Sequence, residues 1–201
     1  MALNTLPAGA FADDAITSDK INLANTFAFT GTVTGAGKFG QMVTDSFTGT
    51  ESSTSKATSD SFTDSSVAAT LTPTATTSKI FVSCQINTGA SNAADGSHIG
   101  RFTQAISGGA TTVVNVGATD GNRIETSSGR GTESQGSNTL LNTHFSFVLE
   151  PSTTSAVTVT YQFAARGTGS ETAYINRTGD NGNNIEQQRT ASHITLMEIL
   201  A

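Results

Sequence analysis

The side chains best suited to acid–base or nucleophilic chemistry are three histidines, His98, His144 and His193, and one cysteine, Cys84. Histidine exchanges protons near neutral pH, and a cysteine acts as a nucleophile when a base lies beside it. The sequence contains neither the H-E-x-x-H motif of zinc proteases nor Cys/His pairs at zinc-finger spacing. His98 follows the letters DGS, but no G-x-S-x-G elbow of a serine hydrolase surrounds it.

The neighbours of these residues indicate structural positions. Cys84 lies in the alternating segment IFVSCQI, residues 80–86, and is expected to be a small apolar residue facing a core. A single cysteine allows no disulfide within the chain. His144 alternates with the apolar residues of its segment, which places it at a surface or an interface, and His193 begins the last expected strand. The sequence therefore predicts no catalytic residue and a protein that is not an enzyme.

Two polar segments have the composition of ligand-binding loops. Residues 179–184 (GDNGNN), with Glu186, are rich in side-chain oxygens but do not follow the spacing of an EF-hand calcium loop. Residues 166–170 (RGTGS) are glycine-rich, yet no helix is expected after them, as a phosphate-binding loop requires. Such loops ordinarily form tight turns. The sequence therefore predicts no cofactor-binding residue, no metal ligand and no cofactor.

Charged residues are scarce, at 13% of the 201 residues, and the net charge is −6. Because no dense cluster of Lys and Arg is present, we expect no nucleic-acid partner. The opening residues MALNTLP lack the basic and apolar regions of a signal peptide. No apolar run reaches the roughly 20 residues of a membrane span, so none is expected.

The elements that position these residues are strands. Apolar residues recur at every second position, as in residues 140–149 and 156–164, and no segment keeps a helical period. The expected strands are residues 41–47, 62–71, 79–87, 98–107, 111–116, 140–149, 156–164, 174–175 and 192–200, with polar loops at 51–61, 90–97, 118–138 and 180–184. Short strands between regularly spaced turns predict an all-β protein, a jelly-roll-like antiparallel β-sandwich.

The last expected strand carries apolar residues on both faces. Ile194 and Leu196 share one face, and Met197 and Ile199 lie on the other. A strand that is apolar on both faces is covered on both sides, so it is expected to be central in its sheet or to lie at a contact between subunits.

Residues 1–37 differ from residues 38–201. They hold isolated apolar residues, including Phe27, Phe29 and Val33, in a polar, glycine-containing frame that is too small to bury a core alone. We expect an extended N-terminal arm, or anchor, that docks on a neighbouring subunit or particle, followed by one β-sandwich domain at 38–201. A frayed leader is the alternative.

Short motifs in a fixed order point to a family. They are SFTD at residues 61–64, TP at 72–73, SKIFV at 78–82, YINRT at 174–178 and HITLMEI at 193–199. In this order and spacing they resemble small virion structural proteins, often grouped with tail fibres, of marine and freshwater tailed bacteriophages, including cyanophages. The chain departs from that pattern at His193, where Ser or Thr is usual. The motifs themselves read as strands and turns, that is, as framework.

The resemblance implies a non-enzymatic structural protein on the exterior of a phage particle. It implies a homotrimeric tail- or head-fibre or appendage protein, anchored through residues 1–37 to capsid, portal/neck or tail proteins. Exposed loops at 90–97, 118–138 and 178–189 would contact the host surface, with a surface glycan as a candidate partner. The alternative is a capsid decoration (cement) protein that clamps the shell, and an enzyme such as a depolymerase ranks third.

Overall fold

The computed structural model of this chain describes residues 38–56, 61–91, 97–129, 137–166 and 171–200, and the structural statements below concern these residues. The expected arm at 1–37 lies outside them, so the boundary at residue 38 stays a prediction. Parts of the expected loops at 51–61, 90–97, 118–138 and 166–170 also lie outside them.

The described residues form eleven strands and no helix. Their bounds are β1 Lys38–Phe47, β2 Glu51–Ser53, β3 Thr63–Leu71, β4 Lys79–Ala90, β5 Ser97–Ile106, β6 Thr111–Val114, β7 Ser128–Gly129, β8 Leu141–Leu149, β9 Val157–Arg166, β10 Ala173–Ile175 and β11 Ser192–Leu200.

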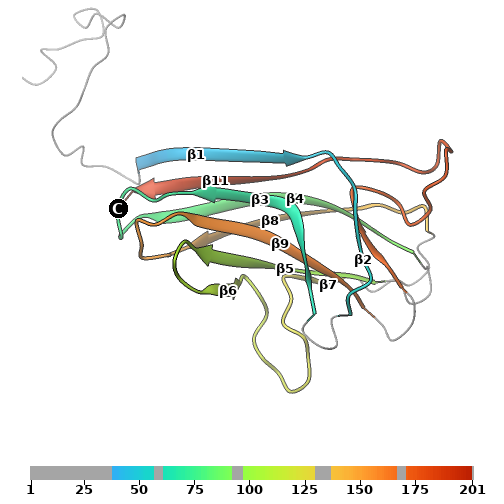
Figure 1. The fold of residues 1–201 in the computed structure, drawn as a ribbon, viewed down its shortest axis with the longest axis horizontal. Coiled ribbons are helices and arrows are strands. Elements are labelled where there is room, and N and C mark those ends of the chain that lie inside the picture. The colour runs from blue at the N-terminus through green and yellow to red at the C-terminus, as the bar shows by residue number, and fades with distance from the viewer. Residues whose placement is uncertain (1–37, 57–60, 92–96, 130–136, 167–170, 201) are drawn as a thin grey trace, which may run out of the picture. The chain divides into compact units, whose positions relative to one another are not determined.

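The strands build two antiparallel sheets that pack face to face (Figure 1). In the first sheet the order is β1-β11-β4-β8, and β10 and β2 extend it beside the end of β4. In the second sheet the order is β3-β9-β5-β6, with β7 pairing β5 next to β6. The long strands, taken in chain order, alternate between the two sheets, which is the wrapping of a jelly roll. They are β1, β3, β4, β5, β8, β9 and β11. The predicted jelly-roll-like antiparallel β-sandwich is confirmed.

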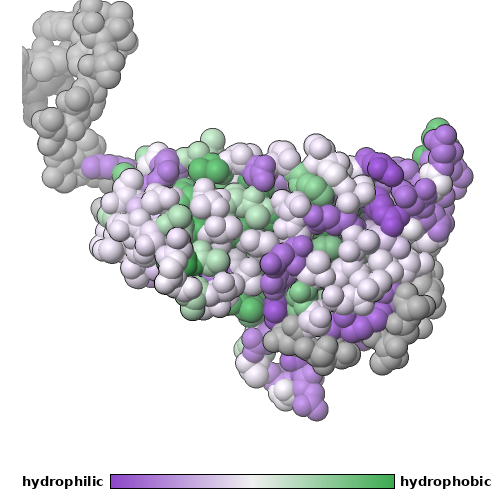
Figure 2. Space-filling model, viewed as in Figure 1, coloured by the Kyte–Doolittle hydropathy of each residue, from purple (hydrophilic) through white to green (hydrophobic). Residues whose placement is uncertain are grey.

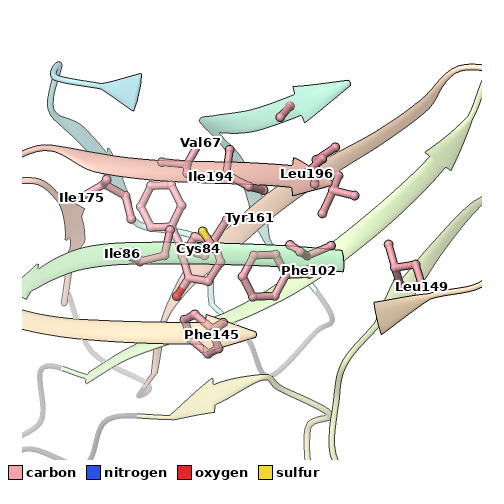
Figure 3. Close-up of a cluster of buried hydrophobic side chains, with 14 of the residues drawn as sticks. Val67, Cys84, Ile86, Phe102, Phe145, Leu149, Tyr161, Ile175, Ile194 and Leu196 are labelled. Carbon is pink, nitrogen blue, oxygen red and sulfur yellow. The ribbon is translucent and has the colours of Figure 1, made fainter. Parts of the chain in front are cut away.

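The core lies between the two sheets and is filled by the inward face of each strand (Figure 3). The alternation predicted for β8 and β9 is confirmed: Phe145 and Leu149 face inward from one sheet, and Val157, Tyr161 and Phe163 from the other. Phe102 packs edge-on against Phe145 and Tyr161, with ring centroids 5.1 and 5.2 Å away. Edge-on aromatic pairs of this kind add to the stability that burial provides.

The sequence-based strands differ from the structure mainly in small elements. The loops expected at 51–61 and 118–138 contain the short strands β2 and β7, which the alternation of apolar residues does not predict. Both consist of polar or small residues, and neighbouring strands hold them: β2 pairs β10, and β7 pairs β5. The last strand is central, as expected, because β11 lies between β1 and β4.

The two ends of the sandwich differ (Figure 1). Short connections, at 72–78, 107–110 and 150–156, lie at the end where β1 starts and β11 finishes. The long connection 176–191 lies at the opposite end, and residues 115–127 project from the free edge of β5 between its pairing with β6 and its pairing with β7 (Figure 1). We call these the turn end and the loop end. Hydrophilic residues gather at the loop end in Figure 2.

A buried carboxylate ties the two sheets together at the turn end. Glu198 in β11 is fully buried, and its Oε1 accepts hydrogen bonds from the backbone N–H and the hydroxyl of Thr74, at 2.6 and 2.7 Å. Its Oε2 accepts a hydrogen bond from Nε2 of Gln41 at 3.1 Å. Burial alone would raise the pKa of Glu198, but these donors outweigh it and lower the pKa to about 2. The carboxylate is therefore ionised and holds the β3–β4 turn against β1 and β11.

At the loop end, a buried asparagine joins separate segments of the chain, as Glu198 does at the turn end. Asn176 follows β10 with φ of 61°, a left-handed conformation that asparagine tolerates better than most residues. Its Nδ2 donates to the carbonyl oxygens of Phe47 and Gly49, at 2.7 and 3.0 Å, and its Oδ1 accepts from the hydroxyl of Ser192 at 2.6 Å. Asn176 thus joins the end of β10, the β1–β2 turn and the start of β11.

Candidate functional site

The residues with catalytic potential occupy separate structural positions. His98, which begins the strand expected at 98–107, is buried in β5, and its Nε2 shares a 3.0 Å hydrogen bond with the hydroxyl of Tyr161. Its ring stacks on Phe163, with centroids 5.6 Å apart. His98 therefore packs as part of the framework.

The other two histidines lie on the outer face of the first sheet. His144 shares a 3.2 Å hydrogen bond with the hydroxyl of Ser83, its neighbour across β4 and β8. His193 is half-buried in β11 and is paired with Gln85. The predicted position of His144, opposite the phenylalanines of β8, is confirmed.

Cys84 is fully buried in the core, as expected, and burial raises the pKa of its thiol to about 12. A thiol with that pKa is protonated at neutral pH and is a poor nucleophile. Among the described residues, no three His, Cys, Asp or Glu side chains come together in a way that could hold a metal ion. No helix in the described part of the chain is long and apolar enough to cross a bilayer.

The oxygen-rich loop after β10 binds its own chain. Asp180 accepts a hydrogen bond from the hydroxyl of Ser137 at 2.5 Å, and its backbone carbonyl accepts one from the hydroxyl of Thr178 at 2.7 Å. Arg189 donates to the side chain of Asn181 at 3.0 Å. In the preceding YINRT segment, the guanidinium of Arg177 lies 3.7 Å from the ring centroid of Tyr174. These contacts stabilise the fold of the loop.

The first candidate surface is the outer face of the first sheet. Register places Met42, Met197, Phe81 and Val148 side by side across β1, β11, β4 and β8. Phe39 and Ile199 are paired next to them, towards the turn end. We call these six residues the apolar band. Phe39 is 70% exposed, Met42 64% and Val148 48%, so the band is open on this face of the chain.

Next to the apolar band, the same face is polar but uncharged. The next row across the sheet is Thr44, Thr195, Ser83 and Ser146, and the row after it includes His193, Gln85 and His144. A Lys79–Glu150 ion pair of 2.6 Å lies at the border of the band at the turn end. An exposed apolar surface with a polar surround is typical of a protein contact site.

The second candidate surface is a pocket near the loop end, which we call the arginine pocket. Its volume is about 530 Å³, and it lies between residues 122–126, the start of β5 and the end of β9. Ile99 and Ile124 provide apolar walls, and Arg123 and Arg166 provide positive charge. Part of the predicted host-contact loop at 118–138 therefore lines a hollow.

Comparisons with known proteins identify no family. No protein-family model and no curated protein matches this chain. Among solved structures, the chain is similar to one described as "Structure of infectious bursal disease virus Gx strain", with a TM-score of 0.34 and 12% identity. That match covers 88% of this chain, and this chain spans 42% of the length of the other. A likeness at this TM-score carries no argument about fold or function, so the proposals below depend on the chain's own residues and contacts.

Proposed function

We propose that this chain is a non-enzymatic structural protein of a bacteriophage virion. In this proposal it is a homotrimeric tail- or head-fibre or appendage protein on the particle exterior. Residues 1–37 anchor it to other virion proteins, and its loop end faces the host. The motifs quoted above suggest this family. The structural observation that carries the proposal is the apolar band, because an exposed row of Met, Phe and Val side chains needs a partner surface.

A second copy of the chain is the partner that best fits this face. The rows beside the apolar band contain no Asp, Glu, Lys or Arg, so identical copies can approach without repulsion between such residues. Met and Phe are enriched in protein interfaces, whereas the charged residues depleted there are scarce on this face. β11, which carries Met197 and Ile199, is then covered on one side by its own core and on the other by a neighbouring subunit.

The different connections at the two ends of the sandwich support the proposed orientation, in which residues 1–37 attach to the particle and the loop end faces the host. β1 starts at the turn end, so residues 1–37 join the domain there. The long connection 176–191 and the arginine pocket lie towards the opposite end. A fibre needs this arrangement, in which attachment and recognition occur at opposite ends of one rigid domain.

A charge placed in the apolar band is expected to prevent assembly. We expect the unaltered chain to have about three times its 20.6 kDa mass in light scattering, and Val148→Asp to be a monomer. The reason is that the new carboxylate would have to lose its hydration in an apolar contact. Val148 is 48% exposed, so the substitution leaves the core of the domain intact.

The matched control is Val113→Asp, which changes a valine of similar exposure, 38%, in the edge strand β6 of the other sheet. It is expected to leave the trimer unchanged. A monomeric unaltered chain at micromolar concentration, or an unchanged mass for Val148→Asp, would contradict the proposed assembly.

The alternative function is a capsid decoration protein. It is favoured by the position of Phe39 and Met42, which are highly exposed in the edge strand β1 and directly follow the proposed arm. A clamp on a shell could use this edge. Gold-labelled antibodies against the purified protein distinguish the two functions on intact particles: we expect label on an appendage, and label spread over the whole shell would favour decoration. No label on particles would overturn both.

A further inference from the structure

The arginine pocket is built on a loop that is tied to the sheet. The backbone N–H of Ser127 donates to the carbonyl of Gly100 at 2.9 Å, and the N–H of Gly117 donates to the carbonyl of Thr126 at 3.3 Å. The hydroxyl of Ser128 lies 3.3 Å from that of Tyr161, which is buried in the core. These bonds fix the base of residues 115–127 against β5 and β9. The side of the pocket formed by Thr126 and β5 is thus set by the domain.

Gly100, in β5 under the pocket, lies so close to Tyr161 that only glycine fits at this position. A Cβ atom at Gly100 would lie 1.8 Å from the hydroxyl oxygen of Tyr161. Only a residue without a side chain allows Tyr161 to reach Ser128 across β5. The contact between loop and core is therefore encoded by Gly100 and Tyr161 together.

The lining of the pocket combines three kinds of chemistry. Ile99 and Ile124 are apolar, Asn122 and Thr126 carry hydrogen-bonding groups, and Arg123 and Arg166 carry guanidinium groups. A volume of about 530 Å³ lies within the range of small-ligand sites. Few polar groups on an apolar wall are typical of such sites, because the polar groups fix the orientation of the ligand.

The charges favour an anionic ligand. Arg123 pairs with Asp120 through Nη1 at 2.7 Å, but a guanidinium has five N–H donors and this contact does not use them all. Both acidic side chains of the loop, Asp120 and Glu125, lie outside the pocket lining, and Glu125 accepts a hydrogen bond from Thr119. The lining thus carries two guanidinium groups and no carboxylate, in a chain whose net charge is −6.

We propose that the arginine pocket binds a saccharide unit that carries a carboxylate. Arg123 and Arg166 hold the carboxylate, since the guanidinium fork matches its two oxygens. Asn122 and Thr126 bind sugar hydroxyls, and Ile99 and Ile124 cover the C–H face of the ring. The pocket lining has no aromatic side chain, so charge rather than ring stacking gives the selectivity. This inference rests on the proposed function in one respect: the proposed function makes the ligand a component of the host surface.

The test uses the full-length chain and calorimetric titration with trigalacturonate, with maltotriose as the neutral trisaccharide. We expect binding of trigalacturonate and none of maltotriose. Arg123→Gln and Arg166→Gln are each expected to weaken trigalacturonate binding about tenfold, the scale of one lost charged hydrogen bond. Arg189→Gln, an exposed loop arginine outside the pocket, is the matched control and is expected to bind normally.

Several results would overturn the proposal. These are equal binding of trigalacturonate and maltotriose, no trigalacturonate binding at millimolar concentration, or unchanged binding in the Arg123→Gln, Arg166→Gln double variant. Binding of dextran sulfate that needs both arginines, without binding of trigalacturonate, would overturn the carboxylate assignment. The virion role is tested separately. If the chain binds trigalacturonate but is absent from particles, the ligand site is established and only the proposed function is overturned.

Discussion

Replacing Asn176 with alanine is expected to lower the free energy of unfolding by about 3–5 kcal/mol. The substitution removes two bonds donated to the carbonyls of Phe47 and Gly49 and one accepted from Ser192, all at a fully buried side chain. Buried polar groups that lose their partner keep the cost of their desolvation. Urea unfolding at pH 7 and a fixed chain concentration measures the change.

Two further variants show whether the side chain or the backbone is responsible. Asn176→Gly keeps the left-handed φ of 61° at little cost and still loses the side-chain bonds, so it is expected to be nearly as unstable as Asn176→Ala. Asn184→Ala, in the exposed loop before β11, is the matched control and is expected to cost less than about 0.5 kcal/mol. A near-native Asn176→Gly variant would show that backbone conformation alone matters at this position.

Replacing Glu198 with glutamine is expected to cost about 2–4 kcal/mol at pH 7, because an amide cannot accept hydrogen bonds at both ends. One end would still meet Thr74, but the other would bring its NH₂ group against Nε2 of Gln41. Chemical unfolding at pH 7 tests this directly. Glu150→Gln, in an exposed ion pair with Lys79, is the control and is expected to change stability by less than about 1 kcal/mol.

The same carboxylate predicts a specific pH dependence. The pKa of Glu198 falls from the ordinary 4.5 to about 2 in the folded chain, so the unfolded chain binds its proton first as the pH drops. Its contribution to stability is complete above pH 4.5 and disappears as the pH falls to about 2. The difference between the unaltered chain and Glu198→Gln should therefore shrink between these pH values. A constant difference over this range would show that Glu198 is not the group responsible.

Regular alternation of apolar residues made most of the fold predictable. β8 and β9 alternate over most of their length, and β11 keeps one regular inward face, so the inward faces of all three strands are those expected from the sequence. β2 and β7 could not be predicted in this way, since their residues are polar or small and only pairing with β10 and β5 makes them strands. The burial of His98 could not be predicted, because a strand buries a polar side chain only when a distant partner, here Tyr161, satisfies it.

The candidate surfaces were only partly visible in the sequence. Met197 and Ile199 indicated a second apolar face on the last strand, but their neighbours Met42, Phe81 and Val148 come from three other strands. The arginine pocket joins Arg123 in a loop to Arg166 at the end of β9. Residues that strand pairing brings together have no fixed spacing along the chain. Neither surface could therefore be identified without the strand register.

Local alternation of apolar residues was enough to predict an all-β sandwich, the faces of its long strands, a buried inert cysteine and a last strand with apolar residues on both faces. The order of strands in the sheets, the hydrogen bonds around Glu198 and Asn176, the apolar band and the arginine pocket depend on tertiary structure. Each of these depends on groups far apart in the chain. Their contact is set by how the two sheets pair and pack, which local sequence does not specify.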